Sequence, residues 1–201
     1  GALTKISKNF INNTDLDVLN FVISKIAKAI ADLLTKEAIL GTGAAGKMTG
    51  IVKTTNVMNA GGATIASITA DKLIDMQLEV PELYQPNAYW TMSKPIFKHI
   101  RKFKDTAGDY ILVKDFSAGG GWLLLGKPVH IEENMPAVAA DAITVAYGDM
   151  SGLAIKLSRD VEIQVLNEIY AVQNAVGVVG WVEADSKIEN AQKFVVLKMA
   201  V

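Results

Sequence analysis

The chain of 201 residues contains no cysteine and only two histidines. The absence of cysteine excludes a disulfide scaffold and any metal or iron–sulfur site with thiolate ligands. An excess of either charge is also missing, because 20 Lys and Arg stand against 21 Asp and Glu for a formal net charge of −1. A nucleic-acid-binding domain usually carries a clear basic excess, so that class is disfavoured, although a local basic strip is still compatible with the composition.

Long apolar runs are missing as well. The longest apolar tract, Leu16 to Leu40, is interrupted by six charged residues: Asp17, Lys25, Lys28, Asp32, Lys36 and Glu37. Such a tract fits neither a membrane span nor the core of a signal peptide, so no membrane partner is expected. The chain also opens on Gly1 rather than methionine, from which we expect a processed protein or a fragment.

What the tract does predict is a long amphipathic helix. Leu19, Ile23, Ile26 and Ile30 recur at three- and four-residue steps, and most of the charged residues fall on the other side. Thr14 followed by Asp17 is a capping pattern that places the start of the helix. About 25 residues in a helix make a rod of about 37 Å, which must pack on a sheet, on another helix or on a neighbouring subunit.

The remaining pattern mixes short helices with many short strands. Helices are expected at 71–80, with Leu73, Ile74 and Leu78 as the apolar positions, and from Lys94-Pro95, with Ile96, Phe97 and Ile100. A further helical stretch is expected at 167–176. Strands are expected at 50–55, 88–93, 110–113, 122–125, 128–132, 143–147, 154–157, 161–165, 178–184 and 194–199. This interspersed order favours an α+β fold over a doubly wound parallel sheet.

Two segments suggest ligand chemistry but support it poorly. The run from Gly41 to Lys47 matches the first seven positions of a phosphate-binding P-loop, yet Met48 stands where that loop needs Ser or Thr. Its predicted order, helix then loop then strand, is also reversed, so we interpret it as a glycine-rich connector. A metal site using His130 with Glu132 or Glu133 is conceivable, but a surface histidine is the commoner case.

The helix from Lys94 has a basic outer side, formed by Lys94, Lys98, His99, Arg101, Lys102 and Lys104. This side could meet phosphate, but a solvated face or a charge partner for another subunit is the better interpretation. A small-molecule-binding α/β enzyme using Lys47 or His130 is kept as an alternative function. Saturable binding of a nucleotide or metal would favour it.

Three blocks of sequence resemble the major capsid proteins of tailed bacteriophages with the Hong Kong 97-type fold. The first block joins the end of the long helix to a glycine-rich turn. The blocks are Glu37-Ala38-Ile39-Leu40-Gly41-Thr42-Gly43 with Gly46 and Gly50-Ile51; Ala88-Tyr89-Trp90-Thr91-Met92-Ser93 with Ile100-Arg101-Lys102-Phe103-Lys104-Asp105, Gly108 and Tyr110; and Leu125-Gly126-Lys127-Pro128-Val129 with Asn134-Met135-Pro136 and Tyr147-Gly148-Asp149. Together they extend over nearly all of the chain.

The resemblance implies a capsid fold with a mixed or antiparallel sheet flanked by helices. Residues 1–55 with 185–201 would form a peripheral domain that carries the long helix, and 56–184 an axial domain. A loop near the capsomer axis would comprise Phe116, Ser117, Ala118, Gly119, Gly120, Gly121 and Trp122. No catalytic, cofactor-binding or metal-binding residue is implied, and no cofactor.

The implied function is that of a phage or prophage shell subunit, not an enzyme. Copies would assemble through pentamers and hexamers into an icosahedral shell that encloses DNA without specific binding, in the cytoplasm of the bacterial host. Portal, maturation protease, scaffold and decoration proteins are the further partners that the resemblance suggests. An encapsulin-type compartment, which shares the fold, is the second reading of the same resemblance.

Family subunits carry an N-terminal arm and an extended hairpin loop upstream of the long helix. Only some 13 residues precede the helix here. We therefore expect a fragment without these two parts, monomeric or weakly oligomeric in solution.

Overall fold

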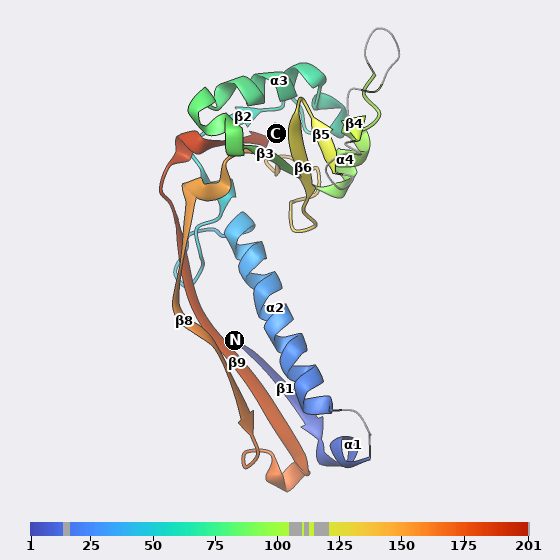
Figure 1. Cartoon of the computed structure of the whole chain (residues 1–201), viewed down its shortest axis with the longest axis vertical. Coiled ribbons are helices and arrows are strands. Elements are labelled where there is room, and N and C mark those ends of the chain that lie inside the picture. Colours follow the sequence, from blue (N-terminus) through green and yellow to red (C-terminus); the bar gives the residue numbers. More distant parts are fainter. Residues whose placement is uncertain (14–16, 105–109, 111–112, 115–120, 201) are drawn as a thin grey trace.

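A computed structural model describes residues 1–13, 17–104, 110, 113–114 and 121–200. The chain forms a head and a long arm, with the N-terminus partway along the arm and the C-terminus in the head (Figure 1). In the described ranges, no helix combines the length and the apolar character that crossing a membrane requires.

The arm is a helix laid on a narrow antiparallel sheet. The sheet has the order β1 (Ala2–Ser7), β9 (Ala175–Ile188), β8 (Leu153–Leu166), and α1 (Lys8–Asn12) follows β1. Helix α2 (Val18–Leu40) buries Ile26 and Ile30 against Val178. Helix α2 comes close to β9 at Gly180, where an added Cβ would lie only 2.6 Å from the Ile26 side-chain atom Cγ2. This contact explains how the predicted rod is stabilised along its length.

The N-terminal cap of α2 is Asp17, whose carboxylate accepts the backbone N–H of Asn20 at 3.2 Å. The predicted capping residue Thr14 lies outside the described residues. The long helix itself is confirmed, with 23 residues.

The head contains a mixed sheet of seven strands. Its order is β2 (Val57–Asn59), β10 (Phe194–Lys198), β7 (Ile143–Gly148), β3 (Tyr89–Met92), β6 (Lys127–Ile131), β5 (Trp122–Leu124), β4 (Val113–Lys114). The β2–β10 and β3–β6 pairs are parallel and the other pairs are antiparallel. Short 3₁₀ turns occur in the head and in the arm, at Ile51–Lys53 (η1), Ile65–Ser67 (η2), Glu82–Asn87 (η3), Met150–Gly152 (η4), Ala171–Gln173 (η5) and Ala191–Lys193 (η6).

Both faces of the head sheet are covered. On one face, α3 (Ala70–Glu79) and α4 (Lys94–Ile100) cover the largest core, centred on Trp90 and Tyr147, whose ring centroids lie 4.3 Å apart. On the other face, Ile39 at the end of α2 packs with Phe194 and Val196. This second cluster joins the arm to the head.

The α+β class is confirmed, and most predicted strands coincide with observed ones. The strand predicted at 50–55 is wrong: Ile51–Lys53 is a 3₁₀ turn, because buried Ile51 turns inward toward Ile39. The helix predicted at 167–176 is also wrong. Its centre is the turn of a long hairpin, where Asn174 adopts a left-handed conformation with φ of 48° and β9 starts at the next residue.

Two further details differ from the prediction. The strands expected at 154–157 and 161–165 are parts of the single strand β8, whose register shifts between Leu157 and Glu162 allow it to continue. In α3, Leu73 is buried as expected, but Ile74 and Leu78 are 41% and 75% exposed, and Met76 occupies the core instead.

The two sheets divide the chain into an arm and a head whose boundaries differ from the predicted domain boundaries. Residues 153–188 lie in the arm with β1 and α2, whereas β10 lies in the head sheet between β2 and β7. The division of the chain into 1–55 with 185–201 and 56–184 thus cuts across both bodies. The roles of peripheral and axial domain stay a prediction, taken up below.

Candidate assembly surfaces

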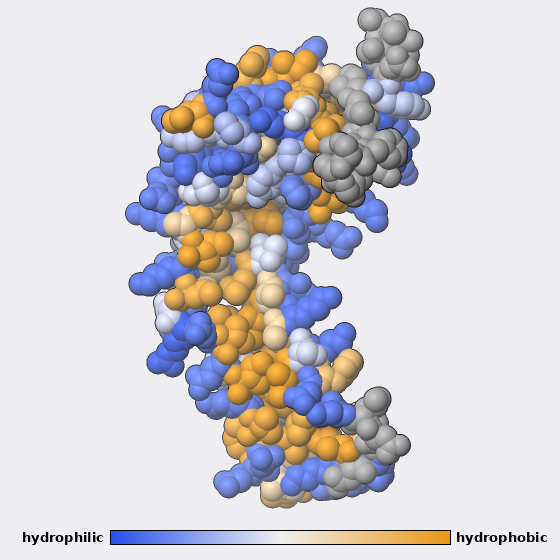
Figure 2. Space-filling model, in the orientation of Figure 1, coloured by the Kyte–Doolittle hydropathy of each residue, from blue (hydrophilic) through white to orange (hydrophobic). Residues whose placement is uncertain are grey.

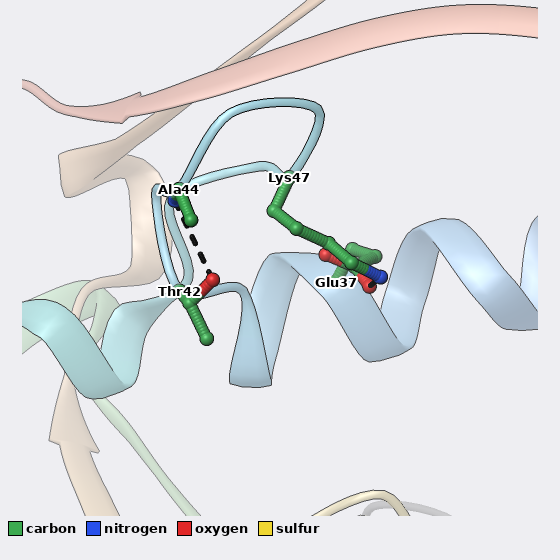
Figure 3. A network of polar contacts seen from close by, with 4 residues as sticks. All are labelled: Glu37, Thr42, Ala44 and Lys47. Atoms are coloured by element: carbon green, nitrogen blue, oxygen red, sulfur yellow. Dashed lines mark hydrogen bonds and ion pairs between the residues drawn. The ribbon is translucent and has the colours of Figure 1, made fainter.

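The glycine-rich segment after α2 is a tight connector. The Gly41 N–H donates to the Glu37 carbonyl at 2.8 Å, and Thr42 and Thr49 form a bridge at the base of the loop. The Ala44 N–H approaches Thr42 Oγ1 at 3.4 Å (Figure 3). Helix α2 therefore presents its C-terminal end to the loop, and the carbonyl groups exposed there repel a phosphate rather than bind it. The interpretation as a connector is confirmed.

Lys47, the residue of the P-loop alternative, is engaged in the same connector. Its Nζ lies 2.9 Å from Glu37 Oε1, and the two side chains meet in Figure 3. The lysine side chain is 55% exposed, so solvent screens this ion pair. Both residues also line a groove of about 720 Å³ between α2 and β9.

We expect Lys47→Ala to lower the free energy of unfolding by less than about 1 kcal/mol, since exposed ion pairs contribute little. Urea denaturation followed by circular dichroism measures this change, with Lys36→Ala, also at an exposed lysine, as the control. A nucleotide that stabilises the wild type but not Lys47→Ala would contradict the connector role.

The two histidines make aromatic contacts. His130 lies in β6 with its ring centroid 4.9 Å from that of Tyr89, and His99 lies 4.9 Å from Phe103. Glu132, which the metal alternative pairs with His130, instead accepts the backbone and side-chain N–H groups of Asn134 at 3.1 and 2.9 Å. Among the described residues, no group of three or more His, Cys, Asp or Glu could hold a metal ion.

The loop predicted near a capsomer axis is only partly described. Phe116, Ser117, Ala118, Gly119 and Gly120 lie outside the described residues, whereas Gly121 is exposed and Trp122 begins β5. The Trp122 ring packs edge-on against Phe97 at 5.6 Å, and the Arg101 guanidinium lies 4.3 Å above it. These contacts fix α4 to the β5 end of the head sheet.

The outer side of α4 and the turn after it form a surface that we name the basic strip. It consists of five exposed side chains: Lys94, Lys98, Arg101, Lys102 and Lys104. The strip exists because Ile96, Phe97 and Ile100 occupy the buried side of the helix and leave the remaining positions to solvent. No acidic residue occurs between positions 94 and 104.

A second head surface, which we name the acidic surface, covers α3 and the start of η3. Its exposed residues are Asp71, Ile74, Asp75, Leu78, Glu79, Glu82 and Leu83. Leu78 and Leu83 are 75% and 80% exposed, far more than leucines usually are. Sequence reasoning missed this surface because it assigned Ile74 and Leu78 to the core. The alternation of acidic and apolar residues in the segment was the available signal.

A half-buried network of hydrogen bonds supports the acidic surface from below. Gln85 of η3 donates from Nε2 to the carbonyls of Gln77 and Val80, at 2.6 and 3.1 Å, and accepts the Tyr147 hydroxyl at 2.8 Å. Burial raises the pKa of the Tyr147 phenol, an effect that a hydrogen bond with Gln77 opposes. The phenol therefore stays protonated near neutral pH and keeps donating, which holds η3 against the core.

The arm is also rich in exposed apolar side chains. Figure 2 shows apolar side chains following the arm on the face in view. Strand β8, at the edge of the arm sheet, exposes Ile155, Leu157, Val161 and Val165, and Trp181 of β9 is 57% exposed. A long edge strand with apolar side chains is a common place for contacts between chains.

Comparisons with known proteins agree on one family. The model of the phage capsid family matches residues 1–199, and a search of curated proteins found no match. The capsid of an empty GTA particle, computed with C5 symmetry, has 24% sequence identity and a TM-score of 0.84. The match covers 100% of this chain and 72% of the GTA capsid chain. A chain of Gordonia phage Cozz has 14% sequence identity and a TM-score of 0.71, and the match covers 100% of this chain and 69% of the phage chain. At these identities, the structures establish a shared fold.

Proposed function

Because this chain belongs to the phage capsid family, we propose that its copies assemble as pentamers and hexamers into an icosahedral shell that encloses DNA. The chain is a major capsid protein, a structural rather than a catalytic component of the virion capsid. The match of the family model over residues 1–199 is the observation that carries the proposal. Neither the encapsulin nor the enzyme alternative finds support in the comparisons.

Self-association is the coarser statement that the comparisons support, since the GTA capsids are particle structures computed with C5 symmetry. The finer partners belong to the proposal: portal, maturation protease, and scaffold or decoration proteins. Assembly in the cytoplasm of the bacterial host is likewise proposed. A net charge of −1 suits a wall that surrounds DNA without holding it tightly.

We assign the head to the axial part of the capsomer and the arm to the peripheral part. This assignment moves residues 153–188 to the peripheral part and β10 to the axial part, following the packing rather than the predicted boundaries. The exposed apolar residues of β8 support a role for the arm in contacts between subunits. The Phe116–Trp122 loop would then lie near the capsomer axis, because β4 and β5 stand at one end of the head sheet.

Negative-stain electron microscopy of the protein expressed from its complete gene, together with any adjacent protease gene, tests the shell. Uniform icosahedral particles are the expected result. Monodisperse monomers or dimers under every assembly condition would overturn the proposal. In the same assay, insertions at Gly119–Gly121 should impair assembly. Unchanged particles would contradict the proposed position of the loop near the capsomer axis.

A further inference from the structure

The basic strip carries its lysines in a regular row. Lys94 and Lys98 are four residues apart and lie on the same side of α4, with a rise of about 6 Å between them, and Lys102 follows four residues later in the turn after the helix. Arg101 is held against Trp122 and Lys104 lies 5.0 Å from the Tyr110 ring centroid. In the part of the chain that the structure describes, none of the three lysines has an ion-pair partner.

The acidic surface repeats the same spacing with the opposite sign. Asp71, Asp75 and Glu79 are also four residues apart along α3, and Ile74 and Leu78 form an adjacent apolar row. None of these carboxylates forms an ion pair with any other described residue. The single half-buried base in this stretch, Lys72, leaves the surface clearly negative.

The two surfaces do not pair with each other within one copy. Helix α3 packs on β10 and β7 and reaches the β5–β6 turn, where Gln77 Nε2 donates to the Leu125 carbonyl at 3.2 Å, while Phe97 of α4 packs against Trp122 of β5. Among the described residues, no side chain of one charged row forms an ion pair with the other row; the ion pairs are Lys47–Glu37 and Lys198–Asp141. The matching rows are therefore available to pair between different copies.

We propose that the basic strip of one copy binds the acidic surface of the next copy, head to tail, as the contact that closes the capsomer ring. This inference rests on the proposed shell function. A contact between two different surfaces of identical subunits is heterologous and closes into a ring when its rotation fits. Pairing of the charged rows sets the register and speeds association, and Leu78 and Leu83 supply the apolar part that exposed ion pairs alone lack.

Charge reversal tests the contact in the protein from the complete gene, with ring and particle formation measured by mass photometry. The variant Lys98→Glu with Lys102→Glu should raise the protein concentration needed for assembly by about tenfold or more, and so should Asp75→Lys with Glu79→Lys. Combining all four changes should restore assembly. The matched control, Lys28→Glu with Lys36→Glu on the exposed side of α2, has the same change in charge and should leave ring formation unchanged.

The outcomes separate this contact from the shell itself. If the wild type forms particles and both reversals do so equally well, the contact is refuted and the shell function stands. Loss of packaged DNA with intact rings in Lys98→Glu with Lys102→Glu would assign the strip to nucleic acid instead, and would also refute the contact.

Zero-length carbodiimide cross-linking gives a second readout that does not depend on particles. In a mixture of ¹⁴N- and ¹⁵N-labelled protein, we expect mixed-isotope cross-links between Lys98 or Lys102 and Asp75 or Glu79, and fewer of them at 1 M salt because screening then acts within about 3 Å. Cross-linked copies that lack these pairs would refute the contact.

Discussion

Replacing Trp90 with alanine is expected to lower the free energy of unfolding by about 4 kcal/mol, the usual cost of truncating a fully buried aromatic side chain. Trp90 has no exposed surface and packs against Tyr147 in the middle of the head core. Its Nε1–H donates to the Leu124 carbonyl at 3.0 Å, so truncation also removes a buried hydrogen bond.

Urea denaturation followed by circular dichroism measures the Trp90→Ala effect, and Trp181→Ala provides the matched control. Trp181 lies in the arm sheet and is 57% exposed, so its loss should cost less than about 1 kcal/mol. If both variants lowered the free energy of unfolding equally, the head core would not dominate the stability of the protein.

Substitution of Gly148 by alanine is expected to cost at least about 3 kcal/mol, because positive-φ strain and a backbone overlap act together. Gly148 has φ of 137° at the end of β7, where an added Cβ would overlap the Lys193 carbonyl oxygen and Phe194 Cα. These contacts lie where β7 pairs with the start of β10, close to the connection between head and arm. The methyl group therefore cannot be accommodated without moving the backbone.

Gly126→Ala separates the two causes. Gly126 also has a positive φ, 77°, but nothing lies within 4 Å of an added Cβ. Its substitution should lower the free energy of unfolding by only about 1 kcal/mol, because a residue with a Cβ is strained by about that much in the left-handed conformation. Thermal unfolding of both variants distinguishes strain from overlap. If Gly148→Ala were no more destabilising than Gly126→Ala, β7 and β10 would have to shift easily.

Local features of the sequence were enough to predict much of the fold. The three- and four-residue steps between Leu19, Ile23, Ile26 and Ile30 determine α2, since a repeat of that length is a property of one segment and needs no partner. In the same way, Lys94-Pro95 and the apolar residues after it determine α4. The family resemblance also came from local blocks and was confirmed over residues 1–199.

The candidate surfaces were predicted only in part. The basic side of α4 follows directly from the spacing of its lysines around Ile96 and Ile100. The acidic surface could not be predicted, because periodicity says that Leu78 lies beside Leu73 and Ile74 but not where the covering sheet ends. Only the position of α3 over β7 and β10 leaves Leu78 outside the core.

The sequence by itself determined the helices, most strand positions and the connector nature of Gly41–Lys47, because each depends on residues close together in the chain. Tertiary structure alone decided that β8 and β9 form one long hairpin paired with β1, and that β10 returns to the head sheet between β2 and β7. β1 pairs with β9 over long separations in sequence, from Ala2 with Gly180 to Ser7 with Ala175. Such pairing depends on which distant edges meet and on how bulges extend a strand, and neither is encoded in local periodicity.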